Sequence, residues 1–407
     1  MSTPPITVLD RPSMIAFINS HLRDYILLIA LAAIMLFFQY TTDGTLFRPV
    51  NLTNIILQNS YIIVMALGML LVIIAGHIDL SIGSVSGFIG AIAALMMTGT
   101  VPIFKDDTMF RFDPFTTGAI CVALGAAIGA FQGYFIAYYK IPAFIVTLAG
   151  MLVFKGLELA ALGGSSVGPF PVTFQRLSNG FVPDIFGGGD SFNILALVVG
   201  IAVSALLIFF NVKDRRAQVA HGLAEEPAEI FWGRNAIIAF ALIGFCWLMA
   251  YYKGLPNVLV VMSVLIAMFM FITKRTTFGR RIYALGGNEK ATKLSGINIE
   301  RLTFQIFTIM GALAGLAGLI FAARLNVATP KAGARFELDV IAACFIGGAA
   351  VTGGVGKVMG AVIGAFIIGV MNNGMSIMGV GIDWQQVIKG AVLLLAVFLD
   401  VYYKKKG

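Results

Sequence analysis

Apolar residues occur in long uninterrupted runs along this chain, and most charged residues lie between the runs. Most runs approach the roughly 20 residues that a helix needs to cross the hydrocarbon core of a bilayer. A strand of an outer-membrane barrel would instead alternate apolar and polar positions. The pattern therefore predicts an all-α, polytopic helical bundle of about 12 membrane segments. The predicted segments are Tyr25–Tyr40, Ile55–Ala75, Gly83–Met97, Thr116–Tyr138, Ala143–Leu162, Phe192–Phe210, Ala236–Tyr251, Val258–Thr273, Leu302–Ala323, Leu338–Ala350, Val358–Met378 and Trp384–Val401.

The third and tenth runs are too short to cross a bilayer alone. An acidic residue stands at the start of each, Asp79 for the third run and Asp339 for the tenth. Spans 2–5 can be aligned with spans 9–12, which lie seven spans later in the chain. Because seven is an odd number, corresponding spans cross the membrane in opposite directions. The sequence thus predicts an inverted repeat with two short or broken helices, which in transporters mark the translocation pathway.

Composition supports a membrane protein and excludes a soluble enzyme. Hydrophobic residues make up 59% of the 407 positions and charged residues only 12%, whereas soluble domains carry about 25% charged residues. The three cysteines each lie within an apolar run, so neither a disulfide framework nor a metal site is expected. The net charge of +8 fits the cytoplasmic loops of a polytopic protein better than a nucleic-acid partner.

The distribution of Lys and Arg predicts the orientation. With the N-terminus inside, eighteen basic residues fall on the cytoplasmic side and eight outside, while Lys155 and Lys389 fall within spans. Cytoplasmic loops carry the excess of basic residues in membrane proteins. An even number of crossings then leaves both termini in the cytoplasm.

Residues 1–24 are expected to form a cytoplasmic N-terminus, and residues 25–407 a single transmembrane domain. The external loop 163–191 is long enough to be ordered only against a partner or the protein itself. The cytoplasmic insertion 213–235 has mixed charges and is expected to form a short amphipathic helix that ends near Pro227. The largest cytoplasmic loop spans residues 274–301.

The candidates for a translocation pathway are Asp79 and Ser81, which precede the third span, Phe144 in the fifth span, and Asn372 and Asn373 in the eleventh. Burial of a carboxylate in a bilayer is costly. Asp79 is therefore interpreted either as part of a polar gate or as a cap of the third helix, with equal weight. Asn372 and Asn373 would line the pathway or bond neighbouring helices.

Lys155 and Glu158 lie three residues apart in the fifth span, at the spacing of a helical ion pair. A self-neutralised pair is the favoured interpretation. A proton relay is the alternative.

The chain lacks a recognisable energy source of its own. The string GGVGKV departs from a phosphate-binding loop because Val351 and Val358 replace the required Gly and Ser or Thr. No cofactor or metal is expected. In the loop 274–301, Asn288 or Gly287 can cap a short helix from Glu289 to Leu294, and Gly296 can end it. Such an exposed, capped helix favours docking to another protein.

Four segments resemble the permease subunit of bacterial ATP-binding-cassette importers for monosaccharides of the ribose and xylose type. They read AGHIDLSIGS, KIPAFIVTLAGML, GRRIYALGGNEKATKLSGINIERL and ELDVIAACFIGGAAVTGGVGKVMGAVIGAFIIGVMNNGMS. The likeness covers nearly the whole chain and is greatest to the xylose or multiple-sugar type, on the element QYTTDGTLF and the extra spans between 192 and 273. His77 and the insertion depart from the family pattern, which bears on the substrate and not on the class.

The resemblance implies an inner-membrane homodimer that works with a cytoplasmic ATP-binding subunit and a periplasmic sugar-binding protein. Its ATPase-coupling loop would comprise Gly286, Gly287, Asn288, Glu289, Ala291 and Gly296. Two alternatives stay open. One is an importer permease of the same superfamily for an amino acid, and the other is an ion-coupled secondary transporter that uses Asp79, Lys155 and Glu158.

Overall fold

The computed structural model describes residues 14–99, 111–188, 192–220 and 227–406. Over these residues the chain forms fifteen helices and no strand, apart from one isolated bridge between Val167 and Ala328. Contacts divide the chain into two compact units. The smaller unit includes residues 181–255, and the larger one includes residues 54–180 and 256–407. The predicted division of the sequence into domains stays a prediction.

The smaller unit is built around a helical pair, α7 (Ile194–Ala220) and α8 (Ala228–Ala250). A side chain at Gly200 of α7 would crowd Cys246 of α8, so the two helices lie close together there. Near the other end of the pair, Asn211 donates a hydrogen bond of 2.7 Å to Asn235. The helix α1 (Met14–Thr41) contributes residues to both units.

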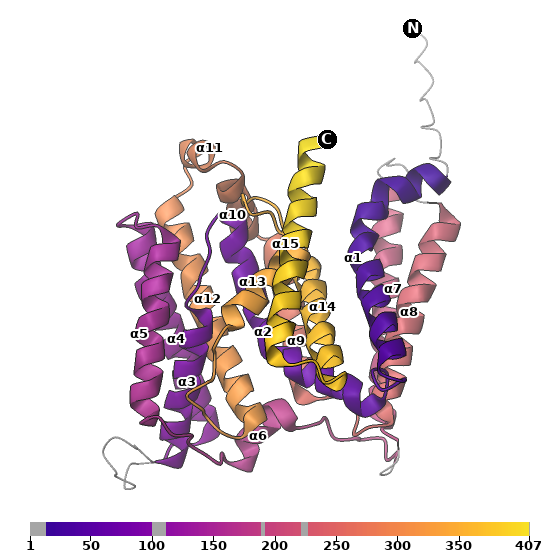
Figure 1. The fold of residues 1–407 in the computed structure, drawn as a ribbon. Coiled ribbons are helices and arrows are strands. Elements are labelled where there is room, and N and C mark those ends of the chain that lie inside the picture. Colours follow the sequence, from indigo (N-terminus) through magenta and orange to yellow (C-terminus); the bar gives the residue numbers. More distant parts are fainter. Residues whose placement is uncertain (1–13, 100–110, 189–191, 221–226, 407) are drawn as a thin grey trace. The chain divides into compact units, whose positions relative to one another are not determined.

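The larger unit is a bundle arranged around α2, whose apolar window is 89% buried, against 22% for α5 and α9 (Figure 1). This burial makes α2 the core of the unit and leaves α5 and α9 at its periphery. Its helices are α2 (Pro49–Ile74), α3 (Ile82–Thr98), α4 (Pro114–Ala137), α5 (Ala143–Leu162), α6 (Val172–Asn179), α9 (Asn257–Arg275), α10 (Thr277–Gly287), α11 (Glu289–Leu294), α12 (Ile299–Leu325), α13 (Phe336–Ile346), α14 (Val358–Ile377) and α15 (Ile382–Lys406).

Each of the twelve predicted segments coincides with a helix, and α5 has the predicted bounds. The third and tenth segments are short, as expected, because α3 has 17 residues and α13 has 11. Among the described residues, eight helices are long and apolar enough to cross a membrane, and neither α3 nor α13 is one of them. The all-α, polytopic class is confirmed, and the inverted repeat stays a prediction.

The prediction of a separate amphipathic helix in the insertion 213–235 is wrong. Helix α7 continues through Lys213 to Ala220, and α8 begins at Ala228 with Pro227 as its N-cap. The stretch from Asn211 to Ala220 contains no Gly or Pro, so nothing in it stops the helix. Residues 221–226 lie outside the described part of the chain, as do residues 1–13 of the predicted N-terminus.

The loop 163–191, which is predicted to be external, is ordered against the protein itself where it belongs to the larger unit. The backbone N–H of Phe170 donates to the side chain of Asn326 at 2.9 Å, and Val167 and Ala328 exchange two backbone hydrogen bonds of 2.9 Å. Asn179, the last residue of α6, donates to the carbonyl of Arg324 at 2.9 Å. The loop therefore covers the end of α12 opposite α10 and α11 (Figure 1).

Helices α4 and α12 cross with their backbones in contact. A Cβ atom on Gly129 would lie 2.9 Å from the Cα atom of Gly311, and a Cβ atom on Gly311 would lie 2.7 Å from the Cα atom of Gly129. Gly125 meets Gly315 in the same way one turn along. Small residues permit this approach, and close packing is what holds helices together in lipid.

Replacement of Gly129 by Leu is expected to destabilise the larger unit, because the side chain has no space between the two backbones. Overpacking of this kind costs about 1–3 kcal/mol or more. The thermal midpoint of the purified protein in detergent measures the effect. Gly118→Leu on the same helix is the control, since a Cβ atom there meets nothing within 4 Å. Equal midpoints for both variants would contradict the packing account.

Asp184 holds the start of α7 in place, within the smaller unit, through hydrogen bonds to its backbone. Its carboxylate accepts backbone N–H groups from Phe186 at 2.9 Å, Gly188 at 3.1 Å, Ile194 at 2.8 Å and Leu195 at 3.3 Å. These hydrogen bonds, led by that of Phe186, hold the pKa of the Asp184 carboxyl below its usual range. Because the pKa of Asp184 is lower in the folded state, its charged carboxylate contributes to the stability of the fold at pH values above the unfolded pKa of about 4.

Acidification below about pH 4 is therefore expected to release the start of α7, because the protonated carboxyl accepts these hydrogen bonds more weakly. Hydrogen exchange at the Ile194 and Leu195 amides should accelerate there. Asp184→Ala should accelerate it at neutral pH as well. Asp113→Ala, which removes the N-cap of α4, should leave these two amides unchanged. Exchange that is insensitive to both pH and Asp184→Ala would refute this role.

Candidate functional site

A cavity of about 660 Å³ opens at the end of the larger unit where α10 and α11 lie. Its walls come mainly from four segments: the link between α2 and α3, the link between α4 and α5 with the adjoining helix ends, the α10–α11 corner and the first turns of α12; Thr352 of the loop before α14 also lines it. Residues from these four segments that line it include Gly76, His77, Ile78, Lys140, Phe144, Gly286, Gly287, Asn288, Glu289 and Thr303. The cavity thus joins the predicted coupling loop to Phe144 of the predicted pathway.

The α10–α11 corner is packed against the end of α2. A side chain at Gly286 would overlap the carbonyl oxygen of Ile74, the last residue of α2. The same oxygen accepts a hydrogen bond of 2.8 Å from the N–H of Gly354. Tyr283 of α10 donates to the carbonyl of Gly356 at 2.6 Å. Glycine is thus required at position 286, and the corner cannot move without disturbing the end of α2.

The glycine-rich string before α14 has a structural role at this corner. Gly353 and Gly354 both have positive φ, of 82° and 73°. A Cβ atom on Gly354 would lie 2.9 Å from the Cα atom of Gly287. These glycines allow the loop to lie directly on the α10–α11 corner. The string that resembles a phosphate loop is therefore used for backbone packing.

Helix α11 has the predicted bounds and the predicted cap. The side chain of Asn288 accepts the N–H of Ala291 at 2.9 Å, and Gly296 follows the helix with a φ of 79°. Thr292 is the only buried residue of α11. Leu294 is 89% exposed. Leu294 was not singled out from the sequence. Its position as the one large apolar residue in the polar run EKATKL could have indicated it.

Asp79 lies in the non-helical link between α2 and α3 and points into the bundle. It is 3% exposed, and its carboxylate accepts the N–H of Ser81 at 2.8 Å and the Ser81 hydroxyl at 2.7 Å. The Ser81 hydroxyl also lies 3.0 Å from the side-chain amide of Gln132 on α4. Asp79 thereby stabilises the entry into α3. The cap and the gate interpretations both stay predictions.

Gln132 was missed by sequence reasoning. It is buried on α4, and its Nε2 atom has no hydrogen-bond partner among the described residues. The sequence signal is a single amide in the glycine-striped run GAAIGAFQGYF. Asp79, Ser81 and Gln132 line a hollow of about 10 Å³, roughly the size that one water molecule needs.

The predicted pathway residues fall into separate places. Phe144 is 56% exposed and lines the large cavity, whereas Asp79 and Ser81 line the small hollow. Asn372 and Asn373 lie on α14 and line neither space. Asn373 is buried, and the Oδ1 atom of Asn372 has no hydrogen-bond partner in the described part of the chain. A common pathway through all five stays a prediction.

The predicted ion pair on α5 is present. The Lys155 ammonium lies 2.8 Å from Glu158, whose side chain is fully buried. A second pair, which was not predicted, joins Lys389 of α15 to Asp339 of α13 at 2.8 Å. Both lysines that fall within predicted spans thus have a carboxylate partner, which lowers the cost of a charge at membrane depth.

Comparisons with known proteins identify the family of the chain. Residues 51–397 match the family model described as the permease component of the branched-chain amino acid transport system. The chain is 38% identical over 387 residues to the xylose transport system permease protein of Escherichia coli strain K12, covering 95% of this chain and 94% of that protein.

The xylose permease of Haemophilus influenzae is 40% identical over 386 residues, covering 95% of this chain and 98% of that protein. The ribose import permease protein of E. coli strain K12 is 33% identical over 378 residues, covering 93% and 92%. No solved structure matches the chain. The chain, a multi-pass membrane protein, therefore belongs to the family of transport permease components that this model describes.

Proposed function

We propose that this chain is the membrane-spanning permease subunit of an ATP-driven importer for a monosaccharide, xylose or a related sugar. The observation that carries the proposal is identity of 33–40% over nearly the full length of both partners to xylose and ribose permeases. The substrate class comes from the names of these relatives and not from any sugar contact in the fold.

ATP hydrolysis is assigned to a separate cytoplasmic subunit. The glycine-rich string lacks the Ser or Thr of a phosphate loop and is occupied by contacts with the α10–α11 corner. Helix α11 supplies a docking element for that subunit. Thr292 is its only buried residue, and the side chain of Leu294 is exposed. A helix that inserts into a groove of a partner exposes an apolar side chain in this way.

The cavity suggests how docking at α11 reaches the pathway. Asn288 and Glu289 line one wall of it, and His77 and Phe144 line the others. The corner also contacts the end of α2 directly through Gly286 and Ile74. A displacement of α11 by the ATPase would therefore act on the link between α2 and α3, where Asp79 and Ser81 lie.

The remaining partners follow from the family. We expect a second copy of the chain to complete the channel, and a periplasmic sugar-binding protein to deliver the substrate. Location in the inner membrane with both termini in the cytoplasm fits the excess of basic residues on the side of α10 and α11. The exposed apolar faces of α5, α7 and α9 fit contact with lipid or with the second copy.

Two other functions are less well supported. An amino-acid importer accords with the description of the family model, but the xylose and ribose permeases described above are named for sugars. An ion-coupled transporter would need a carboxylate open to a coupling ion. Glu158 is instead fully buried and paired with Lys155, and Asp79 is engaged by Ser81.

Proteoliposomes with the cognate ATPase and binding protein test the proposed function. Uptake of labelled xylose should require ATP and should persist in the presence of a protonophore, because no ion gradient drives it. Competition by unlabelled ribose and by leucine separates a sugar from an amino-acid substrate. Uptake that collapses with the protonophore while ATP is intact would reject an ATP-driven importer.

Leu294→Asp is expected to weaken assembly with the ATPase by about ten- to a hundredfold, because burial of a leucine side chain contributes roughly 1.5–3 kcal/mol. Co-purification of the two subunits at graded concentrations measures the loss. Leu294→Met is the matched control, since it keeps the apolar volume and should assemble normally. Thermal midpoints of both variants should equal that of the wild type, because Leu294 makes no buried contact. Unchanged co-purification of Leu294→Asp would remove α11 as the docking element.

A further inference from the structure

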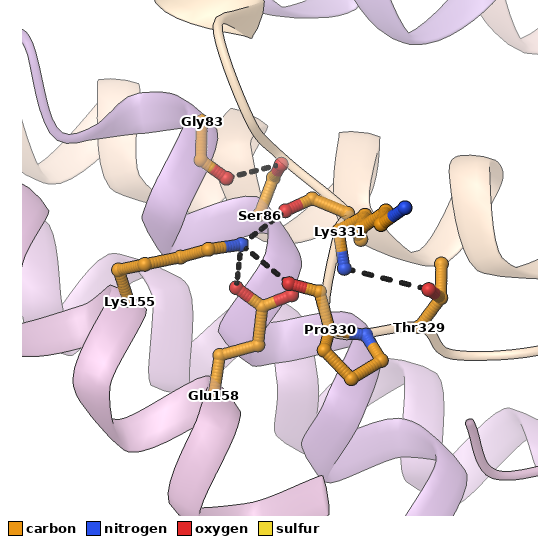
Figure 2. A network of polar contacts seen from close by, with 8 residues as sticks. Gly83, Ser86, Lys155, Glu158, Thr329, Pro330 and Lys331 are labelled. Carbon is orange, nitrogen blue, oxygen red and sulfur yellow. Dashed lines mark hydrogen bonds and ion pairs between the residues drawn. The ribbon is translucent and has the colours of Figure 1, made fainter. Parts of the chain in front are cut away.

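Three oxygen atoms surround the ammonium group of Lys155 on α5 (Figure 2). They are Glu158 Oε2 at 2.8 Å, the Pro330 carbonyl at 2.9 Å and the Ala332 carbonyl at 3.0 Å. An ammonium has three donors, so these oxygens use all of them. Both carbonyls belong to the turn that leads into α13. Lys155 therefore attaches the entry of one short helix to α5.

The surroundings of this cluster are tightly packed. Glu158 is fully buried, and its second oxygen, Oε1, has no hydrogen-bond partner within the described residues. A Cβ atom on Gly87 of α3 would lie 2.8 Å from Glu158 Oε2 and 2.9 Å from the Ala332 carbonyl. An isolated carboxylate at such a place would cost several kcal/mol. Without Lys155, this carboxylate would have to take up a proton or another cation.

We propose that Glu158 and the carbonyls of Pro330 and Ala332 form a binding site for a small monovalent cation, in which the Lys155 ammonium is the resident cation. Lys155 is then a positioning residue, which holds the turn before α13 in place for transport. Carboxylate and carbonyl oxygens are the ligands that hard cations and ammonium groups share. Because its cation is covalently attached, the site needs no coupling ion. The role in transport, though not the site, rests on the proposed function.

The second intramembrane lysine offers a matched comparison. Among the described residues, Lys389 has one oxygen partner, Asp339 at 2.8 Å. The side chains of Lys389 and Asp339 are 12% and 19% exposed, and those of Lys155 and Glu158 are 29% and 0% exposed. No backbone carbonyl of the described residues accepts a hydrogen bond from Lys389. Removal of Lys389 therefore leaves a single carboxylate, whereas removal of Lys155 leaves a fully buried carboxylate together with two carbonyl oxygens that had faced the ammonium group.

Chemical rescue tests the site. Lys155→Ala removes three carbons and the ammonium, which n-propylammonium replaces. The variant in detergent should have a lowered thermal midpoint that rises on addition of n-propylammonium or Na⁺ but not of tetramethylammonium at equal ionic strength. In proteoliposomes its uptake should fall by about tenfold or more and recover with n-propylammonium. Lys389→Ala should respond equally to all three salts.

A double variant, Lys155→Met with Glu158→Gln, keeps the test decisive if Lys155→Ala fails to fold. It removes the buried charge together with its cation, so it should fold and should show no selective response to n-propylammonium. A wild-type midpoint for Lys155→Ala, or equal rescue of the double variant, would overturn the proposal. The thermal readout does not involve transport. Wild-type protein without xylose uptake would therefore reject the proposed function and leave the cation site standing.

Discussion

The structure depends on one constraint: backbone polar groups inside a bilayer must find partners within the protein. The larger unit interrupts its helices between α2 and α3 and again before and after α13, which frees backbone groups within the bundle. Each interruption is met by a specific partner. Asp79 accepts the N–H of Ser81, Gly354 donates to Ile74, and Lys155 binds the carbonyls of Pro330 and Ala332.

These partners also connect the interruptions with one another. The carbonyl of Ile74 is in contact with the α10–α11 corner and with the loop before α14. The corner in turn shares a cavity with His77 and Phe144. In the proposed importer, the element that receives the ATPase is thus one contact away from the link that carries Asp79. The short helices are positioned by tight backbone packing, which favours discrete arrangements over gradual deformation.

Much of this architecture could be predicted because membrane helices are determined by local composition. The run Ala143–Leu162 became α5 without change, and the cap at Asn288 and the bounds of α11 followed from residues within one turn. The extent of α7 was missed, since charge alone does not end a helix that contains no breaker. Helix α6 was missed because its order comes from contacts with α9 and α12, residues distant in sequence.

The candidate site was less predictable, because it too depends on contacts between residues that are distant in sequence. The pairing of Lys155 with Glu158 is local and was anticipated, but the two carbonyls that complete its environment come from residues about 175 positions away. Gln132 and Leu294 matter through their burial and exposure, which a single sequence does not display. Asn372 and Asn373 were grouped with Asp79 by polarity alone, and the fold puts them at different places.

If the ATPase acts through α11 as proposed, the distance between two walls of the cavity, the α10–α11 corner and the link between α4 and α5, should change when the ATPase binds nucleotide. Both segments line the cavity. Spin labels at Lys290 and Tyr139, both exposed side chains, report the distance across it by double electron–electron resonance in the assembled transporter. We expect the distance distribution to shift on addition of a non-hydrolysable ATP analogue. An identical distribution with and without nucleotide would contradict the account.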